Sequence, residues 1–116
     1  MSNSFRGYAE IEIGGSKRPV CVNVNTLALI SERHNMPLSV LLSLDSDKMS
    51  MSHLRTLVWA ALIEGARKSG IPTDFTIEDV GEWITGKMHV VTEILELHKK
   101  AAGAGEAEQK DSSAKK

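Results

Sequence analysis

The chain has 116 residues and a formal net charge of −1, with 14 basic residues scattered among 15 acidic ones. Its length fits one domain with a short appendage, its content of 41% hydrophobic and 25% charged residues is that of a globular protein, and its scattered basic residues argue against electrostatic binding of nucleic acid. Because it has a single cysteine, no leader-like N-terminus and no apolar run of about 18 residues, we expect a soluble cytoplasmic protein without an intrachain disulfide or a membrane span.

Residues 7–24 have the pattern of a β-hairpin. Apolar and polar side chains alternate over 8–13 and again over 20–24, with the period of two that a half-buried strand shows. The segment Gly14-Gly15-Ser16 supplies the turn, because glycine accepts the positive φ of tight hairpin turns. Pro19 lacks a backbone donor, so we expect its strand to be an edge strand or to begin beyond this residue.

Two short helices are predicted next. The first spans about 25–35 and carries Leu27 and Ile30 on one face. The second follows Pro37, which suits the first turn of a helix, and ends at the polar loop 45–47. Its apolar face repeats at i, i+3 and i+4 and consists of Leu38, Leu41 and Leu42.

The segment from about 50 to 70 predicts the most buried helix. A serine at 50 or 52 caps its start, and Gly70 followed by Pro72 ends it. A continuous apolar stripe follows its length, and Trp59 and Ile63 add a second ridge, so the helix must be covered on two sides. The stripe begins at Met51, and its predicted core residues are Leu54, Leu57, Val58, Ala61 and Leu62.

Two more helices are predicted before the end of the chain. Thr76 and Asp79 have the spacing of a capping box, although aspartate is shorter than the usual glutamate, and the helix that follows ends before Gly86. Its core-facing residues are Ile77, Val80 and Ile84. The last helix runs over about 87–100, and one face of it carries Met88, Val91, Ile94, Leu95 and His98.

These elements predict an α+β fold in which an N-terminal β-hairpin packs on a compact set of four to five mostly short helices. We expect residues 7–100 to form a single folded domain and residues 1–6 to be a flexible N-terminus. Residues 101–116 contain no aliphatic side chain larger than alanine, which predicts a disordered C-terminal tail.

No motif in the chain predicts catalysis, a cofactor or a metal. Asp45-x-Asp47 opens like a calcium loop, but the glycine and glutamate that such a loop needs are missing. The glycines at 14–15 lack the ending and the following helix of a phosphate-binding loop. The four histidines lack ligand spacing and are interpreted as surface or boundary residues, and Cys21, in a valine-rich strand, as a small buried hydrophobe. We therefore expect a protein that is not an enzyme.

Binding of other proteins is the remaining class of function. Tryptophan is enriched at binding hot spots, although it is more often a core residue, and the short helix around Trp83 has little room to bury every apolar side chain. Methionine adapts to varied surfaces. The candidate partner-binding residues are Trp83, Met88 and Trp59, with Met36, Met49 and Met51 as further adaptable side chains.

The order of four segments carries a resemblance. They are the hairpin segment Gly7–Gly15, the helical segment Asn25–Glu32, Leu54–Leu62 with its Leu-x-x-Leu-Val-Trp-Ala run, and Phe75–Trp83. Over about residues 7–98 the chain resembles the tail assembly chaperones of long-tailed bacteriophages, in particular the small chaperone-like proteins of siphophage and gene-transfer-agent tail clusters. The tail after Ala101 departs from this pattern.

The resemblance implies a function without chemistry. The protein would bind the tape-measure protein in the host cytoplasm, keep that long apolar helical chain soluble, help to recruit the tail-tube protein, and be absent from the mature virion. A chaperone that coats a long helical partner gains from repeated contacts, so we also expect a homo-oligomer that binds neither nucleic acid nor membrane.

Two alternatives remain open. One is a small structural component of the phage tail or head-tail junction. The other is a small DNA-binding regulator built on the helices around 38–66, against which the sparse basic residues Arg55 and Arg67 count.

Overall fold

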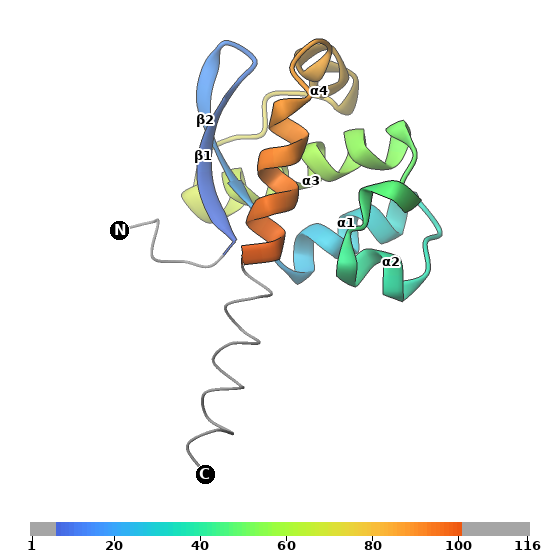
Figure 1. Cartoon of the computed structure of the whole chain (residues 1–116). Helices are drawn as coiled ribbons and strands as arrows, with labels where there is room; N and C mark the ends of the chain where they lie inside the picture. The colour runs from blue at the N-terminus through green and yellow to red at the C-terminus, as the bar shows by residue number, and fades with distance from the viewer. Residues whose placement is uncertain (1–6, 101–116) are drawn as a thin grey trace.

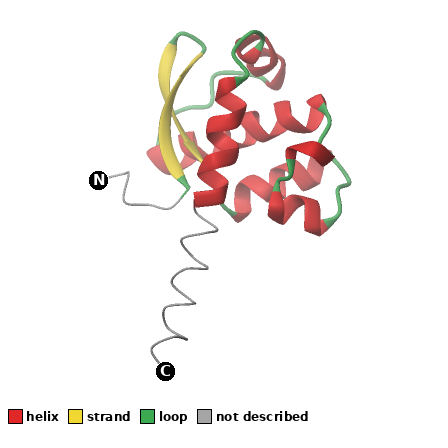
Figure 2. Ribbon diagram, viewed as in Figure 1, coloured by secondary structure: helices red, strands yellow, loops and turns green. Residues whose placement is uncertain are grey.

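A computed structural model describes residues 7–100 of the chain. In this part, a two-stranded antiparallel hairpin is followed by five α-helices and one short 3-10 helix (Figures 1 and 2), which confirms the predicted α+β class. The labelled elements are β1 (Tyr8–Ile13), β2 (Ser16–Cys21), α1 (Val24–Arg33), α2 (Leu38–Ser43), η2 (Ser46–Lys48), α3 (Met51–Ser69) and α4 (Ile77–Ile84). A final helix follows over 89–100. The predicted termini, 1–6 and 101–116, lie outside the described residues.

The hairpin turns through two glycines. Gly14 and Gly15 have φ angles of 65° and 80°, the two positive values that a primed hairpin turn requires. Ile13 pairs with Ser16, so the serine that was predicted in the turn already belongs to β2. Pro19 lies inside β2 opposite Glu10, which is the edge-strand alternative, because a strand of a two-stranded sheet always has one unpaired side.

The hairpin is shorter than the predicted 7–24. Its last cross-strand bond runs from the Val22 N–H to the Gly7 carbonyl, at 2.7 Å. Asn23 then caps α1, because its side chain accepts from the Thr26 N–H while the Thr26 hydroxyl accepts from the Asn23 N–H. Val24, predicted to continue the strand alternation, is therefore the first residue of α1 and is 77% exposed.

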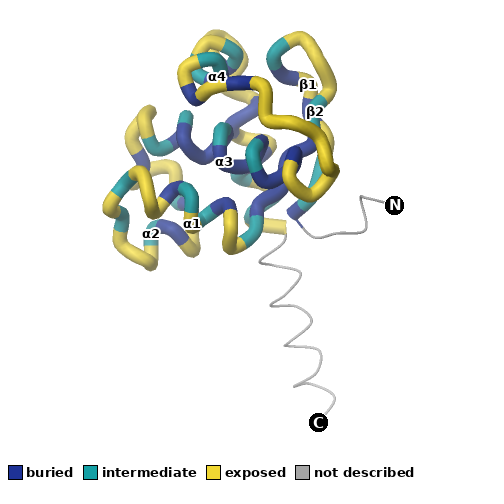
Figure 3. The backbone as a smooth tube through the Cα atoms, turned by 180° about the vertical axis from the view of Figure 1, so that it is seen from behind, coloured by how far each residue is buried: buried dark blue, intermediate teal, exposed yellow. Residues whose placement is uncertain are grey.

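The core surrounds α3. The five predicted core residues Leu54, Leu57, Val58, Ala61 and Leu62 are all buried, and Figure 3 shows the buried course of α3 through the centre of the molecule. Ser50 caps the helix in a capping box with His53, and Gly70 ends it in the left-handed region with φ of 72°. Met51, predicted to begin the buried stripe, is 61% exposed, because the first turn of α3 extends beyond the elements that cover the helix.

The backbone of α3 lies directly against β2. A Cβ added at Gly65 would overlap the Pro19 carbonyl oxygen and lie 2.7 Å from the Val20 Cα. Val20 is fully buried at this contact, and β1 contributes the inward-facing Ile11 and Ile13. A glycine at position 65 is thus a packing requirement: only a hydrogen in place of a side chain lets helix and strand approach this closely.

The outer helices are only partly buried. In α2 only Leu41 of the predicted apolar face is buried, whereas Leu38 is 68% and Leu42 is 57% exposed. The predicted capping box of α4 is present, with the Thr76 N–H donating to Asp79 Oδ2 at 2.9 Å. In the final helix the buried residues are Val90, Val91 and Ile94, and the predicted members Leu95 and His98 are half-buried. This helix begins two residues later than predicted, so Met88 precedes it.

The contact at Gly65 gives a stability prediction. Gly65→Ala places a methyl group into backbone atoms that cannot move separately, and overpacking of this kind costs about 1–3 kcal/mol or more. In Gly81→Ala the new Cβ would meet only the flexible Arg55 side chain, at 3.1 Å, and would gain the helix propensity of alanine, worth about 1 kcal/mol. Thermal melting should therefore show a lower midpoint for G65A and an unchanged or higher one for G81A. A G65A midpoint equal to that of the parent chain would contradict the contact.

Candidate functional site

A buried carboxylate joins α3 to the start of α1. The Glu64 side chain is 2% exposed and accepts from Arg67 Nε at 2.9 Å and Nη2 at 2.7 Å. It also accepts from Asn23 Nδ2 at 2.8 Å and Asn25 Nδ2 at 3.2 Å. The Arg67 hydrogen bonds, opposed by burial and assisted by the two amides, lower the pKa of Glu64 to about 2. The carboxylate is thus ionised at neutral pH and has partners for both of its oxygens.

The neighbouring Cys21 has the surroundings of a structural residue. Burial, followed by the negative charge of Glu64, raises the pKa of the Cys21 thiol above its usual range. The nucleophilic thiolate is therefore disfavoured at neutral pH. This is the environment that the interpretation of Cys21 as a small buried hydrophobe requires. Glu64, Arg67, Asn23 and Asn25 form what we call the Glu64 cluster. We assign a structural role to this cluster, because it holds α1 against α3.

The Glu64 cluster predicts a specific acid sensitivity. Because the folded pKa of about 2 lies below the usual 4.5, the ionised carboxylate stabilises the fold fully above about pH 4.5, and this contribution is lost as the pH falls toward 2. Glu64→Gln should lose about 1.5–3 kcal/mol at neutral pH, the usual value of hydrogen bonds to a charged group. Urea unfolding at neutral pH and at about pH 3 should show a smaller difference between parent and E64Q at the acidic pH.

Glu32→Gln is the matched control for this prediction, because Glu32 is exposed on α1. It should unfold like the parent chain at both pH values. An E64Q deficit that is equal at both pH values would show that the charge of Glu64 is not the source of the stability.

Four basic side chains gather where α1 ends beside the first half of α3. We call Arg33, His34, His53 and Arg55 the basic cluster. The rings of His34 and His53 meet edge to face with centroids 4.5 Å apart, and His53 Nδ1 accepts from the Ser50 N–H. Burial, followed by the charges of His53, Arg33 and Arg55, lowers the pKa of His34 below its usual range.

The tautomer of His34 follows from its hydrogen bonds. The Thr56 hydroxyl donates to the Ser52 carbonyl at 2.9 Å, so its oxygen is the acceptor in the 2.8 Å contact with His34 Nε2. Nε2 of His34 therefore carries a proton, and the ring lies at the boundary of the core, as the sequence predicted for the histidines.

The two tryptophans lie in different surroundings. Trp83 is half-buried, and its ring centroid lies 5.7 Å from that of Phe75. The Arg18 guanidinium carbon lies 4.6 Å from the Trp83 ring centroid. A Cβ added at Gly14 would lie 2.5 Å from the indole, so Trp83 packs directly on the hairpin turn. Trp59 is also half-buried, on α3, with the Arg33 guanidinium carbon 5.3 Å from its ring centroid.

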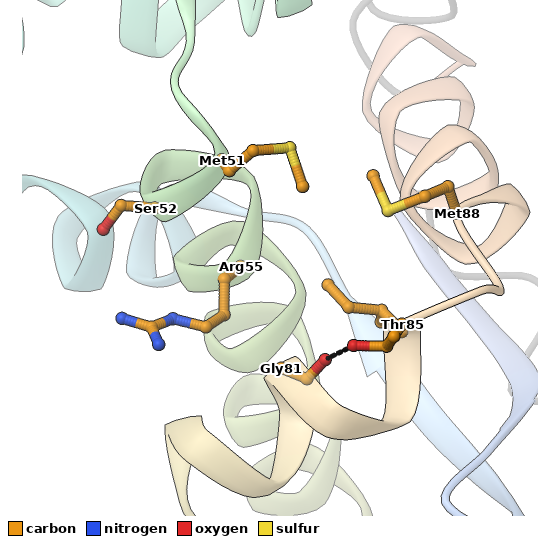
Figure 4. Close-up of a pocket in the computed structure, with 7 residues that line it drawn as sticks. Met51, Ser52, Arg55, Gly81, Thr85 and Met88 are labelled. Atoms are coloured by element: carbon orange, nitrogen blue, oxygen red, sulfur yellow. Dashed lines mark hydrogen bonds between the residues drawn. The ribbon is translucent and has the colours of Figure 1, made fainter.

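A pocket opens between the first turns of α3, the end of α4 and the residue before the final helix (Figure 4). Its volume is about 320 Å³, and its lining residues are Met51, Ser52, Arg55, Gly81, Ile84, Thr85 and Met88. Met51 is 61% and Met88 is 39% exposed. In Figure 4 the thioether ends of these two methionines point toward one another, and the Arg55 guanidinium points away from both. The Thr85 hydroxyl is turned inward, donating to the Gly81 carbonyl at 2.8 Å.

The predicted partner-binding residues are only partly brought together. Met88 lines the pocket, and Trp59 lies one helical turn from the pocket residue Arg55, whereas Trp83 packs on the hairpin turn. Of the other methionines, Met51 lines the pocket, Met49 is buried and Met36 is half-buried. Arg55 was not predicted as a binding residue. Its position four residues after Met51 and four before Trp59 is the signal that places all three on one face of α3.

Within residues 7–100, no group of three or more His, Cys, Asp or Glu side chains could hold a metal ion. No helix in the same range has the length and apolar content to cross a membrane. No family model, curated protein or solved structure matches the chain.

Proposed function

We propose that the chain is a protein-binding domain without enzymatic activity that acts as a phage tail assembly chaperone. It binds the tape-measure protein in the host cytoplasm and helps to recruit tail-tube subunits. The observation that carries the proposal is the pocket with Met51 and Met88 facing each other across its mouth.

The chemistry of the pocket suits a protein partner. Thioether side chains adapt to ligands of different shape, as a holdase for a long and varied apolar helix requires. The volume of about 320 Å³ is near the lower end of small-molecule sites, and it fits one or two apolar side chains of a docked helix.

Exposed apolar side chains elsewhere support repeated contacts. Leu38 and Leu42 lie exposed on the same face of α2. A homo-oligomer that aligns several copies along one tape-measure helix would gain avidity from them, so we include self-association in the proposal.

Co-expression with the tape-measure protein of the same tail gene cluster tests the proposal. The parent chain should keep that protein in the soluble fraction and purify with it. Met51 is 61% and Met88 is 39% exposed, so a partner that covers both buries the equivalent of about one whole methionine side chain, which contributes about 1.5–3 kcal/mol. Met51→Gln together with Met88→Gln should therefore weaken the complex by about 10- to 100-fold.

Val24→Gln is the matched control, because Val24 is 77% exposed on α1. It should leave both the complex and the melting temperature unchanged. Presence of the chain in purified virions would favour the structural tail component instead. DNA binding in a gel shift at moderate salt, without capture of the tape-measure protein, would favour the regulator.

A further inference from the structure

Arg55 lies in the pocket with its aliphatic part held in place. A Cβ added at Gly81 would be only 3.1 Å from Arg55 Cδ, so the stem of the arginine lies over the glycine of α4. In the part of the chain that the structure describes, Arg55 Nε is buried without a hydrogen-bond partner. A buried donor without a partner is unfavourable, and an acceptor that pairs with it removes this cost.

No carboxylate of the described residues neutralises this arginine. The two ion pairs of residues 7–100 join Arg18 to Asp74 and Arg67 to Glu64. The groups that act electrostatically on the nearby His34 are His53, Arg33 and Arg55, all of them basic. The positive charges of Arg55 and of its neighbour Arg33 favour an anionic group on whatever binds there.

The two sides of the pocket thus offer different chemistry. Met51 and Met88 provide an apolar part, and the Arg55 side chain, one turn after Met51 on α3, points away from both methionines (Figure 4). A helix that places an apolar residue and an acidic residue three or four positions apart presents both groups on one face.

We propose that Arg55 binds a carboxylate of the partner, from a helix whose neighbouring apolar side chain enters between Met51 and Met88. This inference rests on the proposed function and specifies the chemistry of its partner segment. The other source of a carboxylate is the chain's own segment 101–116, with Glu106, Glu108 and Asp111. That segment has no apolar side chain larger than alanine to occupy the methionine side, so the geometry favours a separate partner.

Three synthetic peptides test the inference against the full-length chain. Each is an alanine-rich helix of about 20 residues with the same leucine ridge. They differ at one position, four residues from a leucine, which is glutamate, glutamine or lysine. Binding is measured by titration in nitrogen-15 NMR, which also reports the Nε–Hε signal of Arg55.

On the parent chain the glutamate peptide should bind about 10-fold more tightly than the glutamine peptide, the lysine peptide should bind most weakly, and the Arg55 Nε–Hε signal should shift. In Arg55→Gln the preference for glutamate should vanish. Arg55→Lys should keep part of it, because lysine retains the charge but not the planar fork. Lys17→Gln, at an exposed basic residue of β2, should keep all of it. Unchanged amide spectra of the free variants show that the fold is intact.

Three results would overturn the inference, and they differ in whether they also contradict the proposed function of the pocket. Equal binding of the glutamate and glutamine peptides, both weakened by M51Q/M88Q, would exclude the carboxylate contact and leave the proposed pocket standing. Failure of all three peptides to bind at about 1 mM would remove both proposals. A shifted Arg55 Nε–Hε signal in the free full-length E106Q/E108Q/D111N variant would identify the chain's own acidic segment as the occupant.

Discussion

The fold depends on the close approach of α3 to β2 at Gly65. Because no side chain separates the helix from the Pro19 carbonyl, β2 packs directly on α3 and Val20 of the hairpin is fully buried in the core. Glu64, the residue before Gly65 on α3, accepts hydrogen bonds from the side-chain amides of Asn23 and Asn25 at the start of α1. One helix thereby fixes both the sheet and the first helix, through one contact that excludes a side chain and one that satisfies a buried charge.

The same helix has a different role at its other end. The hairpin contacts the second half of α3, and α1 lies along α3 from Glu64 to Thr56, whereas the first turns of α3 carry the exposed Met51 and the half-buried Arg55. Helix α4 and the residue before the final helix approach these turns without closing over them, and the pocket is the space that remains. A rigid, buried helix therefore holds the pocket side chains in place, which lowers the entropic cost of binding a partner.

Local patterns predicted most of the elements, because their signals are local. The alternation of polar and apolar residues predicted β1, and the paired glycines predicted the turn. Ser50 and Gly70 predicted the two ends of α3. The errors arose where an amphipathic pattern was equated with burial. Leu38, Leu42 and Met51 have the correct period for a core face, but whether a periodic face is covered depends on which elements pack against it. Val24 was misplaced because a helix cap at Asn23 prevailed over the strand alternation.

The features that require long-range contacts could not be predicted from the sequence. Glu64 is bonded to asparagines about forty positions away, and nothing local distinguishes it from an exposed helical glutamate. The pocket likewise joins residues of α3 to Gly81 and Met88. Of its members, only the methionines carried a chemical signal in the sequence, and Met88 was predicted on that basis.

Methionine methyl NMR tests the central claim, that a partner helix occupies the pocket, most directly. With the methyl carbons of the five methionines labelled in the full-length chain, the tape-measure segment that co-purifies with it is added back. The account predicts that the methyl signals of Met51 and Met88 shift together, while those of the buried Met49 and the half-buried Met36 stay in place. A complex that forms while the Met51 and Met88 signals remain unchanged would contradict it.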